Sequence, residues 1–229
     1  MEINKIYNTD CITFMETEMK PNSVDFTLTD IPYDEVERAT NGLSSLSSLD
    51  DMRGADDLTF DIQSFCENVY RITKNSICIF CSREQFSEIY NFFAAKPGTT
   101  RPIVWEKTNP VPSNGQYVYL SGVEFAVWFK KRGAKVFNAH CKNTVMRYPI
   151  FGGKNRIHPA QKHPDLFKEL ILDNTNEGDI VFDPCAGGMT AAWVAAENNR
   201  NFICCELDED FYNTGIKFLK EKINYDNEH

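Results

Sequence analysis

Short apolar runs alternate with longer amphipathic segments along most of this chain. Ile62, Phe65, Val69 and Ile72, for example, recur at the spacing of one helix face. Comparable patterns predict helices over residues 11–19, 60–72, 83–95, 164–172, 190–198 and 207–223. The short apolar runs predict strands over residues 4–7, 24–29, 76–80, 102–105, 123–129, 180–182 and 201–205. Strands that alternate with helices predict an α/β fold with a mostly parallel, doubly wound sheet.

Three segments interrupt this alternation. Residues 34–61 are polar, acidic and rich in serine, which predicts a long loop. Residues 109–115 are rich in proline and asparagine and also predict a loop. Residues 133–157 combine glycine, proline and basic side chains with weak periodicity. We therefore expect residues 1–229 to form one domain, with 133–157 as a short basic insertion.

The length and composition of the chain fit this organisation. A chain of 229 residues, 42% of them hydrophobic, can bury a full core. No apolar run approaches the roughly 20 residues that span a bilayer, and the first residues lack the apolar centre of a signal peptide. We expect a cytoplasmic protein with no membrane partner.

The eight cysteines do not indicate a disulfide framework. Cys185, Cys204 and Cys205 lie in or beside apolar strand-like runs, where a free thiol behaves as a small hydrophobe. Cys78 and Cys81 have the spacing of half a zinc site, but the sequence offers no second half, so we expect no metal.

The net charge of −9 argues against a nucleic-acid partner, but the distribution of the charge favours one. No Asp or Glu occurs from Phe125 to Pro164. The same stretch contains Lys130, Lys131, Arg132, Lys135, Lys142, Arg147, Lys154, Arg156 and Lys162. A basic stretch in an acidic protein is typical of phosphate contact. The alternative is a solvated basic face that pairs with acids elsewhere.

Two of the predicted strands stop abruptly at polar turns. One segment is Val181-Phe182-Asp183-Pro184-Cys185-Ala186-Gly187-Gly188-Met189-Thr190, and the other is Leu28-Thr29-Asp30-Ile31-Pro32-Tyr33. Ligands bind at such positions in open α/β sheets, and small residues let the backbone approach them closely. The strand that follows the first segment ends at Glu206, and a carboxylate at this spacing can accept hydrogen bonds from ribose hydroxyls. Asp208 is the expected N-cap of the last helix.

Both segments resemble motifs of the β-class DNA amino-methyltransferases. Asp30-Ile31-Pro32-Tyr33 is similar to the Asp-Pro-Pro-Tyr box of that family, and residues 183–190 are similar to its Asp-Pro-Phe-Ala-Gly-Ser-Gly-Thr loop. The box precedes the loop, which is the circularly permuted order of the β class. The resemblance spans about residues 3–219. It implies the Rossmann-like fold of S-adenosylmethionine-dependent methyltransferases.

The resemblance also implies which residues hold S-adenosylmethionine. Asn8-Thr9-Asp10-Cys11 is similar to the family's Asn-Gly-Asp-Cys, whose acid reaches the adenine ring of the cofactor. Residues 158–162 are similar to its His-Pro-Thr-Gln-Lys, which implies that Lys162 lies near the cofactor carboxylate. The expected cofactor-binding residues are Asp10, Cys11, His158, Lys162, Asp183, Pro184, Cys185, Ala186, Gly187, Gly188, Met189, Thr190, Glu206 and Leu207.

The expected catalytic residues are those of the box, Asp30, Ile31, Pro32 and Tyr33. An exocyclic amine is a poor nucleophile because its lone pair is delocalised into the base. Two acceptors on its N–H groups, the Asp30 carboxylate and the carbonyl of residue 31, can rehybridise the nitrogen and stabilise its developing positive charge. Tyr33 is expected to stack on a base that has left the duplex.

Family usage of an Asp in the box implies N6 of adenine in DNA as the methyl acceptor, with N4 of cytosine as the alternative. We expect residues 133–157 to read the target sequence, and the expected DNA-binding residues are Lys130, Lys131, Arg132, Lys135, Lys142, Arg147, Lys154 and Arg156. A homodimer, a second specificity subunit and a cognate restriction enzyme are the further partners that such an enzyme implies.

Two departures from the family pattern keep another interpretation open. Ile31 replaces the first proline of the box, although Pro32 still favours an extended backbone at residue 31. Met189 replaces the second glycine of Gly-Ser-Gly, where a positive φ would strain a methionine. A catalytically weak relative that only binds DNA is therefore an alternative. A dinucleotide oxidoreductase is disfavoured, because residues 187–188 lack the Gly-x-Gly-x-x-Gly spacing.

Overall fold

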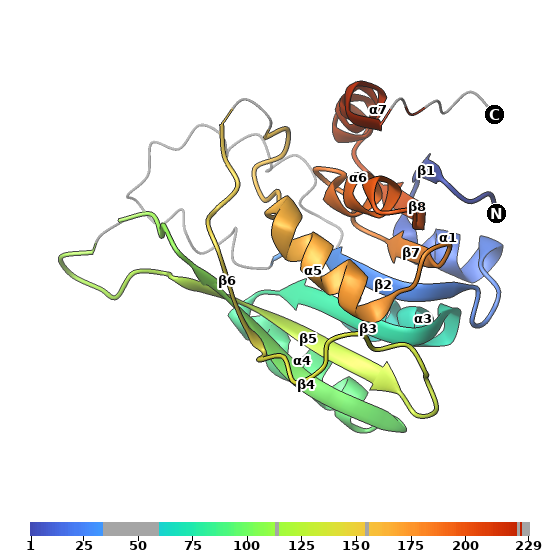
Figure 1. Cartoon of the computed structure of the whole chain (residues 1–229), viewed down its shortest axis with the longest axis horizontal. Coiled ribbons are helices and arrows are strands. Elements are labelled where there is room, and N and C mark those ends of the chain that lie inside the picture. Colours follow the sequence, from blue (N-terminus) through green and yellow to red (C-terminus); the bar gives the residue numbers. More distant parts are fainter. Residues whose placement is uncertain (34–59, 113–114, 154–155, 224, 226–229) are drawn as a thin grey trace.

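The chain folds around one twisted sheet of eight strands, seen in a computed structural model that describes residues 1–33, 60–112, 115–153, 156–223 and 225 (Figure 1). The strand order is β1-β8-β7-β2-β3-β5-β4-β6. The strands are β1 (Lys5–Asn8), β2 (Val24–Asp30), β3 (Thr73–Cys81), β4 (Gly98–Lys107), β5 (Val123–Lys131), β6 (Val145–Tyr148), β7 (Ile180–Asp183) and β8 (Asn201–Glu206). The predicted α/β class with a mostly parallel sheet is confirmed, because β5 alone among these strands pairs antiparallel with its neighbours.

Helices cover both faces of the sheet. The helices are α1 (Cys11–Glu18), α3 (Ile62–Ile72), α4 (Arg83–Ala94), α5 (Pro164–Asn174), α6 (Thr190–Glu197) and α7 (Glu209–Ile223). Figure 1 shows α5 and α6 in front of the sheet and α3 and α4 behind it. Alternate residues of the central strand β3 point to opposite faces. Cys78 and Phe80 thus join the core beneath α5, α6 and α7, whereas Ile77 and Ile79 join the core beneath α1, α3 and α4.

Side-chain caps fix where several helices begin. Asp10 accepts a hydrogen bond from the Thr13 amide at the start of α1, and Asp61 does the same for α3. Ser82 and Gln85 form a reciprocal capping box at the start of α4. The predicted cap of α7 is confirmed, because Asp208 accepts from the Phe211 amide at 2.8 Å.

The structure departs from the expected elements on one side of the sheet. The segment 133–157 contains β6, which the sequence did not predict because the strand is four residues long and carries an exposed Arg147. It pairs in parallel with the end of β4. The predicted loop at residues 34–61 falls mainly on residues 34–59, which lie outside the described residues.

The direction of β5 decides which residues lie near the ligand-binding edge of the sheet. In the antiparallel register, Phe125 pairs with Cys81 at the carboxyl end of β3, whereas Lys130 pairs with Ser76 near its start. The end of β5 therefore lies at the sheet edge opposite the carboxyl ends of the parallel strands. The basic stretch that follows β5 begins on the far side of the molecule.

No helix in the described part of the chain is long and apolar enough to cross a membrane. Cys78 and Cys81 are buried free thiols of β3. The described residues also contain no group of three His, Cys, Asp or Glu side chains placed to hold a metal ion.

Candidate active site

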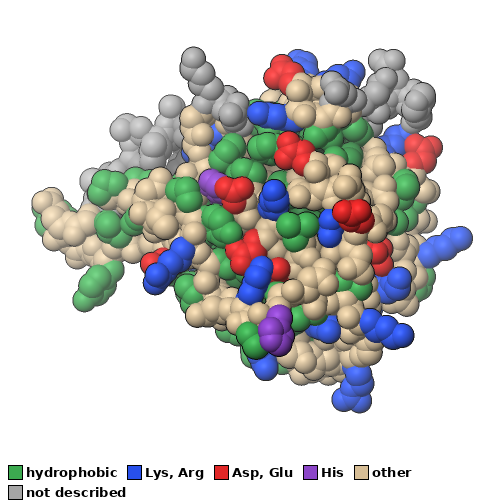
Figure 2. Space-filling model, viewed as in Figure 1, with side chains coloured by type: hydrophobic (Ala, Val, Ile, Leu, Met, Phe, Trp, Pro, Cys, Tyr) green, Lys and Arg blue, Asp and Glu red, His purple; other side chains and the backbone are tan. Residues whose placement is uncertain are grey.

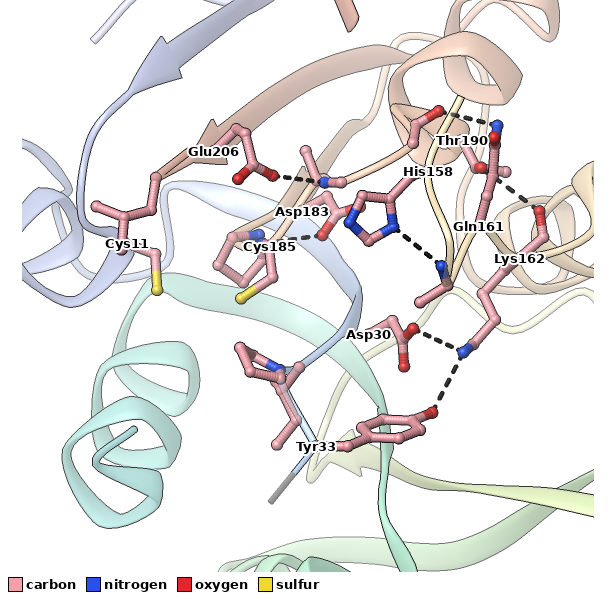
Figure 3. Close-up of a pocket in the computed structure, with 18 of the residues that line it drawn as sticks. Cys11, Asp30, Tyr33, His158, Gln161, Lys162, Asp183, Cys185, Thr190 and Glu206 are labelled. Atoms are coloured by element: carbon pink, nitrogen blue, oxygen red, sulfur yellow. Dashed lines mark hydrogen bonds and ion pairs between the residues drawn. The ribbon is translucent and has the colours of Figure 1, made fainter. Parts of the chain in front are cut away.

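A cavity of about 400 Å³ lies at the carboxyl ends of β2, β7 and β8. Asp30 from the end of β2 and Gly187 from the turn after β7 line the same cavity, so the two polar turns of the sequence meet there (Figure 3). The remaining lining residues include Thr9, Asp10, Cys11, Ile31, Pro32, Tyr33, Phe60, His158, Gln161, Lys162, Phe167, Asp183, Pro184, Cys185, Ala186, Gly188, Thr190, Glu206 and Leu207. This volume falls within the range of small-molecule sites.

The turn after β7 needs glycine at residue 187. Gly187 has φ of +43°, and a Cβ there would lie 3.3 Å from the ring of His158. The Gly187 amide donates to Glu206 Oε2 at 2.7 Å, and Glu206 Oε1 accepts from the Asp208 amide at 3.0 Å. The end of β8 therefore holds the turn in place and presents a carboxylate to the cavity.

The neighbouring Gly188 is clamped by the segment 157–162. The Gln161 side chain donates to the Gly188 carbonyl at 3.0 Å and accepts from the Ile157 amide at 2.9 Å. A Cβ on Gly188 would lie 2.5 Å from Gln161 Cγ. Gln161 lies within residues 158–162, which resemble the His-Pro-Thr-Gln-Lys motif, but the sequence analysis assigned it no role. Its place between two backbone segments became visible only in three dimensions.

Burial shifts the pKa values of several groups in this half of the cavity. It raises the pKa of Asp183 to about 7, although the Cys185 amide donates to this carboxylate at 3.1 Å. Burial also raises the pKa of Glu206. Burial, and the nearby Lys162 charge, lower the pKa of His158 to about 4, so its ring is neutral at neutral pH.

Met189 adopts the strained conformation that the sequence predicted for a positive φ. Its φ is +55° and its ψ is +23°, in the left-handed region. The side chain is fully buried and faces Gly215 of α7, where a Cβ would lie 2.5 Å from Met189 Cγ and Cε. Core packing against a glycine thus offsets the backbone strain, and the side chain itself points away from the cavity lining.

Asp10 has a structural partner as well as a place in the cavity wall. Its Oδ1 accepts from both the amide and the hydroxyl of Thr13. The adjacent Cys11 also lines the cavity, and it belongs to the core cluster against which Cys185 from the turn after β7 packs. The two segments implied to surround the cofactor are therefore in contact.

The Asp30 box is held by hydrogen bonds that replace the missing proline. The Ile31 amide donates to the Phe80 carbonyl at 3.1 Å, a bond that a proline could not make. Gln85 of α4 donates to the Pro32 carbonyl at 2.8 Å. Ile31 is buried. The backbone of the box is thus fixed on both sides of the substitution.

The two oxygens of the Asp30 carboxylate have different surroundings. Asp30 Oδ2 accepts from the Lys162 ammonium at 2.6 Å. Asp30 Oδ1 is buried and has no hydrogen-bond partner among the described residues. A buried carboxylate oxygen without a donor is costly unless a ligand supplies one. Figure 3 shows this carboxylate at the end of β2 beside Lys162 and Tyr33.

Comparison with known proteins agrees with this geometry. The sequence profile of the N6/N4 DNA methylase family matches residues 24–217. The chain belongs to the DNA methylase family. It is 27% identical to the type II methyltransferase M.HinfI of Haemophilus influenzae, over 96% of this chain and 69% of M.HinfI. It is 33% identical to the DNA adenine methyltransferase YhdJ of Escherichia coli (strain K12), over 57% of this chain and 38% of YhdJ.

A solved structure of a relative shares the whole fold of this methylase. The crystal structure of the M1.HpyAVI–SAM complex superposes with a TM-score of 0.70 and 27% identity. The superposition covers 93% of this chain and 98% of M1.HpyAVI. The resemblance drawn from the sequence motifs is thereby confirmed at the level of family and fold.

Lys162, which the resemblance places near the cofactor carboxylate, lines the cavity. Its ammonium lies 2.6 Å from Asp30 Oδ2, 2.7 Å from Glu124 Oε2 and 3.2 Å from the Tyr33 hydroxyl. Glu124 was not predicted as a site residue, because a single acid on a strand carries no motif signal.

The expected DNA-binding residues are divided between two edges of the sheet. Lys130, Lys131 and Arg132 follow the end of β5 at the edge opposite the cavity, and Lys135 lies just beyond them. Lys142 pairs with Asp173 at the end of α5, also on that side. These five residues therefore lie away from the cavity edge, and their contact with DNA stays a prediction.

Other expected DNA-binding residues lie at the cavity edge. Arg147 of β6 is level with Glu106 near the end of β4. Arg156 donates to the carbonyl of His158, a residue that lines the cavity. Lys154 lies outside the described residues. Figure 2 shows Lys and Arg side chains spread over the visible face rather than gathered in one patch.

Proposed function

We propose that this methylase transfers a methyl group from S-adenosylmethionine to the N6 amine of adenine in DNA. The observation that carries the proposal is Asp30, which lines the cavity that also contains the Gly187 turn and whose buried Oδ1 has no hydrogen-bond partner among the described residues. An amine with two N–H donors supplies the hydrogen bond that this oxygen lacks. A cofactor site and an acceptor site in one cavity are what a direct methyl transfer requires.

The residues in the cavity fit S-adenosylmethionine. Small residues at 186–188 leave the backbone accessible, and a side chain at 187 or 188 would fill the space beside His158 and Gln161. The Glu206 carboxylate, which lines the cavity, can accept hydrogen bonds from ribose hydroxyls. When bound, the cofactor supplies an electrophilic methyl group on its sulfonium. We propose that Asp183, Gly187, Gly188 and Glu206 hold it.

In the proposed reaction, the box at residues 30–33 binds and activates the adenine amine. Asp30 Oδ1 accepts one N–H of the adenine amine and draws the nitrogen lone pair out of the ring. The negative charge of Asp30 stabilises the positive charge that develops on the nitrogen during transfer. The Tyr33 ring, held through its hydroxyl by Lys162, forms part of the wall against which the extruded base lies.

We propose that DNA lies along the cavity edge of the sheet, against the segment 133–157 where it carries β6 and Arg147. The connection between β4 and β5 projects from the same edge (Figure 1) and exposes the rings of Tyr117 and Tyr119. Aromatic side chains can stack on bases that have left the duplex. The same surfaces would serve the alternative substrate, N4 of cytosine.

Nucleoside mass spectrometry of DNA from cells that express the chain tests this function. We expect N6-methyladenine with the wild-type chain and none with Asp30→Asn. N4-methylcytosine in place of N6-methyladenine would establish the alternative substrate. Unmodified DNA from cells containing the soluble wild-type protein, together with calorimetry that detects bound S-adenosylmethionine, would overturn the assignment of an active enzyme.

A further inference from the structure

The Lys162 ammonium is buried between two carboxylates from different strands. The side chain of Lys162 is 4% exposed and contacts Asp30 at the end of β2 and Glu124 on β5. The other oxygen of Glu124 lies 2.8 Å from the ammonium of Lys107 on β4. We call Asp30, Lys162, Glu124 and Lys107 the Lys162 cluster. Its charges alternate in sign from the cavity outward, which lets each buried charge have an opposite neighbour.

The Lys162 cluster distinguishes the two oxygens of Asp30. Oδ2 is occupied by Lys162, and Oδ1 is the buried oxygen without a donor among the described residues. A carboxylate held on one oxygen cannot rotate freely, so the other oxygen keeps a fixed direction. The Tyr33 hydroxyl accepts from Lys162 at 3.2 Å and donates to Glu124 at 3.3 Å, which ties the Tyr33 ring to the same ions.

Glu124 has an electrostatic consequence for the proposed chemistry. A lone ammonium beside Asp30 would make a neutral pair and would oppose the positive charge that develops on the attacking amine. With Glu124 on the far side of the ammonium, Asp30, Lys162 and Glu124 together carry a net charge of −1, and Lys107 on the outer side of Glu124 makes the whole cluster neutral. The Glu124 charge thus offsets the Lys162 charge nearest to the amine, and this difference acts on the transition state.

We propose that Lys162 and Glu124 are positioning residues for methyl transfer: Lys162 holds Asp30 ionised with Oδ1 directed at the amine, and Glu124 holds Lys162 in place. The proposal rests on the proposed function and deepens it. Lys162 acts on Asp30 directly, and Glu124 acts through Lys162. Neither residue touches the transferred methyl group in this account.

The two residues affect the ionisation of Asp30 in opposite directions. Burial raises the pKa of Asp30, the Lys162 charge lowers it, and the Glu124 charge raises it again. The charged and titratable groups that face Asp30 are Lys162, Glu124, Tyr33, Cys81 and Asp183. Removal of Lys162 should therefore raise the pKa of Asp30, and removal of the Glu124 charge should lower it. A purely structural role would not produce shifts of opposite sign.

Carboxyl carbon NMR of the cofactor-free protein measures this ionisation without any reaction. The Asp30 signal is assigned by its loss in Asp30→Asn. We expect its titration midpoint to rise in Lys162→Met, by on the order of one pH unit, and to fall in Glu124→Gln. The matched controls are Lys168→Met and Glu197→Gln, which change exposed side chains of α5 and α6 and should leave the midpoint in place.

Single-turnover methyl transfer as a function of pH supplies the second readout. Transfer requires ionised Asp30, so its acidic limb follows the pKa of that group. The limb should move to higher pH in Lys162→Met and to lower pH in Glu124→Gln. The maximal rate of Glu124→Gln should nevertheless fall by about tenfold or more, because the net charge near the amine is lost.

Several outcomes would overturn the proposal. Shifts of the same sign in the two variants, or an Asp30 midpoint unchanged in both, contradict the positioning role. If Lys162→Met fails to fold, the double variant Lys162→Met/Glu124→Gln should restore the fold, because it removes one charge of each sign. If the double variant also fails to fold and the Asp30 titration midpoint does not shift in Glu124→Gln, the proposal is contradicted as well. If the wild-type chain transfers no methyl group, the proposed function fails, whereas the NMR titration still decides whether the cluster controls Asp30.

Discussion

The two halves of the cavity are formed by different chemical groups. The half formed by the turn after β7 relies on backbone groups and on the absence of side chains at Gly187 and Gly188. The half formed by the end of β2 relies on charged side chains, with Lys162 between Asp30 and Glu124. One half should therefore be sensitive to added volume and the other to changed charge. Mutations can separate binding of the methyl donor from transfer of the methyl group.

The largest expected effect belongs to the charged half. Asp30→Asn keeps the volume of the side chain but removes the charge that stabilises the amine. We expect the single-turnover rate of methyl transfer to fall by about 10²–10³, with the affinity for S-adenosylmethionine unchanged in calorimetry. Asp210→Asn, an exposed acid of α7, is the control. Equal loss of transfer and of cofactor affinity would mean that the two halves are not separable.

Substitution of a glycine in the other half should weaken binding of S-adenosylmethionine and leave the transfer step intact. Gly188→Ala places a Cβ within 2.5 Å of Gln161 Cγ and forces the turn or the clamp to shift. We expect the affinity for S-adenosylmethionine to fall roughly tenfold or more, with transfer recovered at saturating cofactor. Gly152→Ala adds the same atom in open space and should bind the cofactor normally. Unchanged affinity in Gly188→Ala would contradict the role of the turn.

The packing behind the turn gives a smaller effect on stability. Gly215→Ala directs a Cβ at the buried Met189 side chain, so we expect the free energy of unfolding to fall by about 1–3 kcal/mol. Denaturant unfolding measures the loss. Because the two residues are in contact, Met189→Ala should cost less in the Gly215→Ala background than in the wild type. Strict additivity in this double-mutant cycle would show that the contact carries no strain.

The smallest expected effect compares the two edges of the sheet outside the cavity. Arg156→Gln at the cavity edge should weaken duplex binding several-fold and lower the salt dependence of binding by about one phosphate contact. Lys130→Gln at the opposite edge should leave both quantities unchanged, because β5 directs it away from the cavity. Fluorescence anisotropy over a range of salt concentrations distinguishes the two. Equal effects would place DNA across both edges.

The sequence predicts elements and motifs better than it predicts contacts between distant segments. Periodicity and turn residues located the helices, and the two boxes and their order indicated the family. The antiparallel direction of β5 leaves no local signal, so the sequence did not indicate that Lys130 lies at the edge opposite the cavity. Lys162 and Glu124 lie 38 residues apart in sequence, and no local pattern indicates that they share an ion pair.

The departures from the family motifs show the same limit in finer detail. The positive φ of Met189 could be anticipated from the glycine that the family carries there. Its compensation by Gly215 could not, because it depends on how α7 crosses the start of α6. Likewise, the hydrogen bonds of Ile31 and Pro32 come from β3 and α4. These contacts show how the structure accommodates Ile31 and Met189 in place of the proline and glycine of the family motifs.

Binding of a bisubstrate compound tests most directly whether one cavity holds both reactants. The compound joins the N6 atom of adenosine through a short linker to the sulfur position of a cofactor analogue. If the Gly187 turn and Asp30 face one another as described, the compound should bind wild type at least about tenfold more tightly than the analogue alone. Asp30→Asn should abolish this gain without weakening the analogue. Equal affinities of the compound and the analogue for the wild-type protein would contradict the account.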